Sequence, residues 1–112
     1  MIGVEEDLRP ESLRKRDKGK DVRAADHELK CWPEFFDKIS SGEKRHDLRR
    51  STDRDFKVGD LMKLREFDPV AERYTGRVQY VEVTYITSSD LPCALSKGAL
   101  HSDFCILSIK MM

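Results

Sequence analysis

Residues 42–50 read Gly42-Glu43-Lys44-Arg45-His46-Asp47-Leu48-Arg49-Arg50 and follow a short amphipathic segment. A glycine at the start of such a stretch is typical of the left-handed turn that ends a helix. The residues after it have the pattern of a strand, so the stretch predicts the passage from a helix to a strand. It also places several cations around one acidic side chain, which predicts a small cationic pocket at this junction.

The residues before the junction predict a strand and a helix. Residues 27–31 alternate polar and apolar side chains, as a short strand does. Pro33 suits the first position of a helix, because its missing N–H is not needed there, and the helix should end at Gly42. Four apolar side chains at helical spacing would dock this helix on the core: Trp32, Phe35, Phe36 and Ile39. We expect Trp32 to pack there; the alternative is a stacking surface for a nucleobase.

The residues after the junction predict four more strands. Leu48 should point inside in the first of them, and Tyr85 should share a face with Val81 and Val83 in the third. Residues 68–76 read as a long hairpin connection, because Asp68 and Pro69 are turn residues, and residues 88–102 read as a loop. The four strands are expected at residues 44–50, 61–67, 78–86 and 104–109. With one short helix after the first of five strands, this order predicts an α+β, mostly β fold that forms a small closed or nearly closed barrel.

Length and charge limit the class of protein. The 112 residues allow one folded domain, which we place at 27–112, after a charged arm at 1–26 that we expect to be mobile. Lys and Arg number 21 and so do Asp and Glu, so any affinity for polyanions must be local. No apolar run approaches the roughly 20 residues of a membrane helix, and the first residues do not resemble a secretory signal. We therefore expect a cytoplasmic protein with no membrane contact.

The cysteines and histidines predict no metal site. The chain has three cysteines without C-x-x-C spacing, which argues against a disulfide framework and a four-thiolate zinc site. We expect them to be small buried hydrophobic residues, and we expect no cofactor. The cysteines are Cys31, Cys93 and Cys105, and the histidines His27, His46 and His101 are scattered along the chain without metal-ligand spacing.

Side-chain alternation decides which charged residues can meet at the junction. Arg45, Asp47 and Arg49 should share one face of the strand, with Lys44 close to them at its start. A carboxylate in this position holds guanidinium groups in a fixed orientation, and oriented arginines suit phosphate or a base edge. The alternative is a structural salt-bridge network that only joins the helix to the strand.

The junction resembles a known family signature. Residues 42–49 are similar to the G-x-K-x-x-E-x-R signature of the ASCH superfamily, whose fold is the small PUA-like β-barrel. Three further stretches extend the likeness to a small bacterial and phage family placed in that superfamily: residues 27–33, 56–60 and 66–69. The resemblance covers roughly residues 27–110. It implies a cleft between the first helix and the barrel, used for RNA binding or for chemistry on nucleotides.

One branch of that superfamily hydrolyses the acetyl amide of N4-acetylcytidine with a lysine, a threonine three residues later and a later glutamate. Lys44 matches the lysine, but Asp47 stands at the threonine position. Residues 88–102 contain no glutamate. Asp47 also replaces the usual glutamate of the superfamily signature and keeps its charge on a shorter side chain.

Three functions follow as hypotheses. The leading one is binding of a nucleic acid or nucleotide, most of all RNA, with Asp47 orienting the arginines; the expected contacts are Lys44, Arg45, Arg49, Arg50, Arg54 and Lys57. The second is an amidohydrolase or nuclease-like enzyme acting on a modified nucleoside or RNA, with Lys44 as base and Asp47 positioning water or substrate. The third is a protein-interaction module that contacts its partner through residues 1–26.

Overall fold

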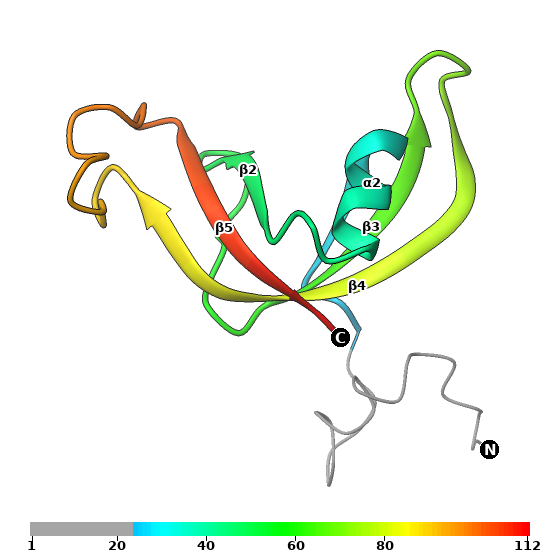
Figure 1. Ribbon diagram of the computed structural model, residues 1–112, viewed down its shortest axis with the longest axis horizontal. Helices are drawn as coiled ribbons and strands as arrows, with labels where there is room; N and C mark the ends of the chain where they lie inside the picture. The colour runs from blue at the N-terminus through cyan, green and yellow to red at the C-terminus, as the bar shows by residue number, and fades with distance from the viewer. Residues whose placement is uncertain (1–23) are drawn as a thin grey trace, which may run out of the picture.

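The computed structural model describes residues 24–112 and has the predicted order of five strands and one helix (Figure 1). Residues 1–23 are outside the described part of the chain, and so is most of the predicted arm at 1–26. The mostly β architecture with a short helix after the first strand is confirmed. The elements are β1 (His27–Cys31), α2 (Pro33–Ser40), β2 (His46–Arg50), β3 (Leu61–Asp68), β4 (Arg73–Ser88) and β5 (Phe104–Met111).

The strands form one curved sheet in the order β1-β3-β4-β5-β2. Only β1 and β3 run parallel, and the other neighbours are antiparallel. The long strand β4 runs along the floor of a half-barrel, with β1 and β3 in one arm and β5 and β2 in the other (Figure 1). Strands β1 and β2 are therefore the two edges of the sheet, which curves without closing into the predicted barrel. The link from α2 to β2 runs from one arm to the other (Figure 1).

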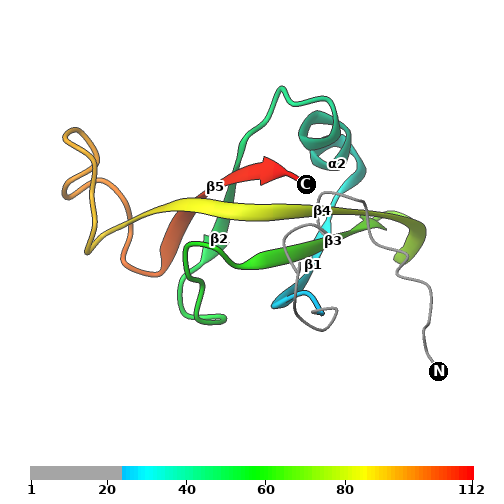
Figure 2. The same cartoon turned by 90° about the horizontal axis from the view of Figure 1, so that it is seen from below.

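The core lies inside this curve, where α2 covers one face of the sheet (Figure 2). Phe36 and Ile39 are the buried residues of the helix, which begins at Pro33 and is followed by Gly42 at φ 84°, as predicted. Four of the core side chains of β3 and β4 are fully buried: Met62, Leu64, Val81 and Val83. Burial of this apolar surface is the main force that docks α2 on the sheet.

The prediction that Tyr85 shares a face with Val83 is wrong. Tyr85 is 58% exposed and does not lie on the buried face of Val83. The pairing with β5 shifts between these residues, because Val83 pairs with Ile109 whereas Tyr85 pairs with Ser108. β4 therefore has one more residue than β5 at this point, which is a β-bulge. The bulge turns the side chains that follow it to the other face of the sheet.

The hairpin between β3 and β4 is also shorter than predicted, because β4 begins at Arg73 and not near residue 78. Asp68 pairs directly with Arg73 in the ladder. The Asp68 carboxylate accepts hydrogen bonds from the N–H groups of Val70 and Ala71, at 2.9 and 3.2 Å. The side chain thus closes a four-residue turn in which Glu72 adopts a φ of 56°.

The buried carboxylate of Glu66 ties β3 to β4 and, through Arg77, to α2. Arg77 donates from Nε and Nη2 to the two carboxylate oxygens of Glu66, at 2.8 and 2.7 Å, and from Nη2 to Asp37 at 2.6 Å. Thr75 donates a further hydrogen bond to Glu66. The guanidinium of Arg77 and the Thr75 hydroxyl lower the pKa of Glu66 from its ordinary value of 4.5 to about 2.

This shift predicts how stability depends on pH. Because the pKa of Glu66 is lower in the folded chain, its stabilisation is complete above pH 4.5 and is lost as the pH falls from there toward 2. In Glu66→Gln, unfolding should take up roughly one proton fewer near pH 3 than in the wild type. Urea unfolding at a series of pH values measures this slope, and Glu72→Gln at the exposed hairpin turn is the control. An unchanged slope in Glu66→Gln would contradict the assignment.

Candidate functional site

The two edge strands of the half-barrel approach each other and are joined by arginine side chains. Arg49 of β2 donates from Nη2 to the Lys30 carbonyl of β1 at 2.8 Å and from Nε to Asp47 at 2.8 Å. Farther along, Arg54 donates from Nη1 to the Glu28 carbonyl at 3.3 Å. We call this line of contact between β1 and β2 the seam. The contacts run antiparallel, because Arg54, which lies beyond the end of β2, meets a residue of β1 that precedes the partner of Arg49.

The strand β2 turns Asp47 and Arg49 inward at the seam. Asp47 and Arg49 are 13% and 22% exposed at their side chains, whereas Leu48 is 53% exposed. The prediction that Leu48 points inside is therefore wrong, although the predicted sharing of one face by Asp47 and Arg49 is right. The Asp47–Arg49 ion pair occupies the place that an apolar side chain would take in a closed core.

An open cleft of about 370 Å³ lies at the end of the seam nearest α2. Three residues of the predicted site line it, namely Lys44, Asp47 and Arg49. The rest of its lining comes from β1, the start of α2 and β2: Lys30, Cys31, Trp32, Phe35 and Leu48. We call this space the seam cleft. The ion pair of Asp47 with Arg49 is thus structural and at the same time part of the wall of a cavity.

The aromatic side of the seam cleft comes from Trp32 and Phe35. They are 48% and 43% exposed, and their rings stack with centroids 6.3 Å apart and planes at 21°. The prediction that Trp32 and Phe35 dock on the core is wrong. Trp32 is the N-cap of α2 with an extended backbone, at φ −66° and ψ 152°, so helical spacing does not govern its direction. Its indole instead offers a flat apolar surface to the cleft.

Lys44 supplies the cationic side of the seam cleft. Its ammonium lies 5.7 Å from the centroid of the Phe35 ring and 3.3 Å from Nε2 of His46. The backbone N–H of Lys44 donates to the Lys38 carbonyl at the end of α2, which fixes the start of the side chain. Within residues 24–112, no carboxylate forms an ion pair with Lys44. Its charge is therefore available to a ligand.

The thiol of Cys31 is the remaining reactive group in the wall. Burial and the neighbouring Asp47 carboxylate raise the pKa of Cys31 to about 11, so the thiol stays protonated near neutral pH. Cys31 and Cys105 are buried as predicted, but Cys93 is exposed. Among residues 24–112, no group of three or more His, Cys, Asp or Glu side chains is arranged to hold a metal ion.

The other predicted contacts do not gather at the seam cleft. Arg45 donates to the Gly42 carbonyl and lines a separate cavity near the end of β5. Arg50 lies over the Phe104 ring on the opposite face of β2, 5.0 Å from its centroid. Arg54 lies farther along the seam, and Lys57 pairs with Asp55. Lys30, Trp32 and Phe35 line the cleft instead, and an N-cap position for Trp32 next to Pro33 is the sequence signal that would have placed it outside the core.

The fold and the site define a small half-barrel with an open cleft walled by aromatic rings, one lysine and an arginine–aspartate pair. Residues 26–109 match the family model described as a domain of unknown function (DUF3850), and the chain belongs to that family. Among curated proteins, no sequence is significantly similar to it. In the described part of the chain, no helix is long and apolar enough to cross a membrane.

Proposed function

We propose that this protein binds single-stranded RNA through the seam cleft, and that its half-barrel is a PUA-like fold of the ASCH type. Support for the fold comes from the helix after the first strand and from the signature positions Lys44, Asp47 and Arg49, which meet in one cavity. The observation that carries the binding proposal is the ammonium of Lys44. It has no carboxylate partner within residues 24–112 and faces a cleft with two exposed aromatic rings.

Each side of the cleft can contact a different part of a nucleotide. A base stacks on Trp32, a contact worth about 1–3 kcal/mol per base in single-strand binding proteins. Lys44 neutralises a neighbouring phosphate as a point charge. Arg49 is held by Asp47 and by the Lys30 carbonyl, so it presents its guanidinium in one orientation. The half-barrel offers no long helix for the major groove of duplex DNA, which favours a single strand.

The cleft favours binding over the hydrolase alternative. Asp47 is the one acidic residue among its lining side chains, and its carboxylate accepts a hydrogen bond from Arg49. A carboxylate held in this way orients the arginine and is less available to activate water. The Cys31 thiol stays protonated and supplies no nucleophile near neutral pH. Incubation of the protein with RNA, followed by measurement of the length of the recovered RNA, shows whether any hydrolysis takes place.

Lys44→Ala tests the proposal through the affinity for RNA. Removal of one phosphate contact should weaken binding of a fluorescently labelled single-stranded RNA about tenfold, which corresponds to about 1.4 kcal/mol. It should also make the dependence of log K on log salt shallower by about 0.7 for a single strand. Fluorescence anisotropy at several salt concentrations measures both quantities. The slope of the wild type should lie near −3 if about four phosphates are engaged.

Lys97→Ala is the matched control, because Lys97 is exposed on the loop between β4 and β5 and lines none of the cavities near the seam. It should leave affinity and salt slope unchanged. Equal affinity of Lys44→Ala and the wild type would show that Lys44 does not contact the RNA. Absence of RNA binding by the wild type would overturn the proposal.

A further inference from the structure

A second cavity, of about 350 Å³, continues the seam beyond the seam cleft. The two cavities share Lys30 and Arg49 in their walls, so one lies on each side of the contact between these residues. The second cavity reaches Arg65 of β3 and Tyr74 of β4, neither of which lines the seam cleft. We call it the outer cavity.

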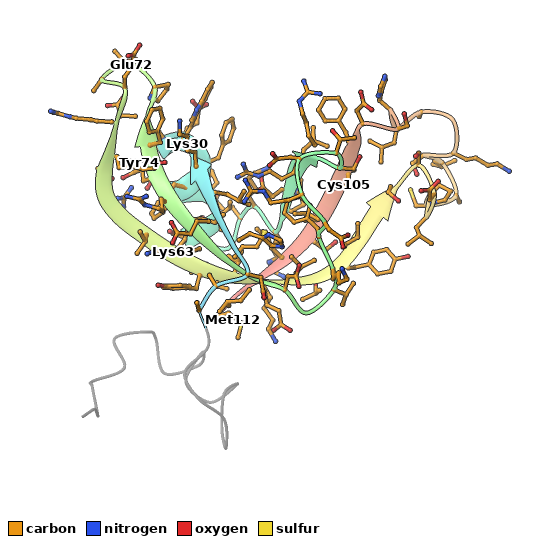
Figure 3. The ribbon with its side chains drawn as sticks, turned by 180° about the vertical axis from the view of Figure 1, so that it is seen from behind. Lys30, Lys63, Glu72, Tyr74, Cys105 and Met112 are labelled. Atoms are coloured by element: carbon orange, nitrogen blue, oxygen red, sulfur yellow. The ribbon has the colours of Figure 1, made fainter. Side chains whose placement is uncertain are left out.

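The outer cavity repeats the chemistry of the seam cleft, with cations placed on aromatic rings. The guanidinium carbon of Arg65 lies 3.8 Å from the centroid of the Tyr74 ring. Lys30 lies 4.2 Å from the centroid of the Phe67 ring, which meets Tyr74 edge-on at 5.2 Å. Tyr74 is 39% exposed, and Lys30 and Tyr74 lie on the same arm of the half-barrel (Figure 3). Cations next to a partly exposed ring suit a phosphate beside a stacked base.

The charges along the outer cavity remain positive after internal pairing. It is lined by four cations and by the acids Glu28 and Asp53. Asp53 pairs with Arg54 at 2.9 Å, and Glu28, which is 56% exposed at its side chain, forms longer ion pairs of 3.9 Å with both Arg65 and Lys63. Within residues 24–112, no ion pair engages Lys30. An anion that enters from the seam cleft therefore meets Lys30 first and Arg65 farther along.

The distance between the two cavities sets the length of the ligand. The seam cleft reaches Cys31 and the outer cavity reaches Glu28 of the same strand, three residues away. At about 3.3 Å per residue this distance is about 10 Å along β1. The rise of one strand of a duplex is about 3.4 Å per nucleotide, so about three stacked nucleotides cover it.

We infer that the RNA runs along the seam, from Trp32 and Lys44 across Lys30 and Arg49 to Arg65 and Tyr74, so that the ligand is a segment of about three nucleotides and not a single nucleotide. This proposal rests on the RNA binding proposed above and adds a second subsite. Arg65 lines the outer cavity but not the seam cleft. A substitution at Arg65 therefore tests the second subsite without changing the first.

A length series of oligouridylates tests the second subsite. Uridine monophosphate, the dinucleotide, the trinucleotide and the hexanucleotide are titrated into the wild type, Arg65→Gln and Lys63→Gln, with Trp32 emission as the readout. Lys63 is the matched control, because it lies two residues from Arg65 on the same strand and lines neither cavity. Thermal unfolding of each variant shows that it is folded.

For the wild type, affinity should rise at least tenfold from the monophosphate to the trinucleotide. Arg65→Gln should weaken trinucleotide binding about fivefold to tenfold, make its salt slope shallower by about 0.7, and leave the monophosphate unchanged. Lys63→Gln should leave both ligands unchanged. Equal affinity for all lengths, or the same loss in both variants, would overturn the second subsite while RNA binding at the seam cleft still stands. No binding at any length would overturn both.

Discussion

Replacing Arg49 by methionine should lower the midpoint of thermal unfolding by about 12 °C or more and weaken RNA binding about tenfold. Arg49 joins the two edge strands through Asp47 and the Lys30 carbonyl. Without it, the Asp47 carboxylate, 13% exposed, loses its charged partner. Loss of one partner of such a pair costs roughly 3 kcal/mol, and each kcal/mol shifts the midpoint of a domain of this size by about 4–8 °C.

The neighbouring arginine is the control for this substitution. Arg50→Met removes the same charge from the same strand, but Arg50 lies on the outer face over Phe104 and its loss should cost less than about 1 kcal/mol. In the double variant Asp47→Asn/Arg49→Met the unpaired carboxylate is gone, so part of the lost stability should return. A shift of less than about 3 °C in Arg49→Met would show that the seam is not held by this side chain.

Replacing Trp32 by alanine should weaken binding of single-stranded RNA roughly 30-fold. The indole is nearly half exposed at the mouth of the seam cleft, and loss of one stacked base costs about 2 kcal/mol. Because the side chain contributes little to the core, thermal stability should change by less than about 1 kcal/mol. Anisotropy of labelled RNA measures the affinity, since the variant lacks tryptophan.

Tyr85→Ala is the control for Trp32→Ala, because Tyr85 is 58% exposed and lines a cavity at the far end of β4. It should leave RNA affinity unchanged. A similar loss of affinity in both variants would indicate nonspecific contacts with exposed aromatic rings. A large loss of stability in Trp32→Ala would indicate that the indole belongs to the core after all.

Local patterns were sufficient to predict the elements of this fold but not the directions of individual side chains. Pro33 and Gly42 mark the helix correctly because both signals depend on the local backbone alone. Tyr85 and Trp32 were placed wrongly because strict periodicity fails at a bulge and at an N-cap. Leu48 was placed wrongly because an ion pair takes the inward position that an apolar residue usually fills.

The candidate site divides in the same way. Asp47 and Arg49 share a face by strand alternation, and Lys44 reaches the same cleft from the link between α2 and β2, so closeness in sequence was enough to predict this group. Two features of the site depend on the parallel pairing of β1 with β3 and on the curvature of the sheet. They are the contact of Arg49 with Lys30 and the position of Arg65 in the outer cavity. Neither of these has a local signal in the sequence. Arg45 and Arg50 failed to join the cleft because the turn at Gly42 and the pleat of β2 send them elsewhere.

The emission of Trp32 tests the central proposal most directly, since it is the one tryptophan of the chain and stands in the wall of the seam cleft. On titration with single-stranded RNA at low salt, we expect saturable quenching that weakens as salt is added and is reduced in Lys44→Ala. Emission that stays constant up to millimolar RNA would show that no base reaches the indole, and would contradict the proposal.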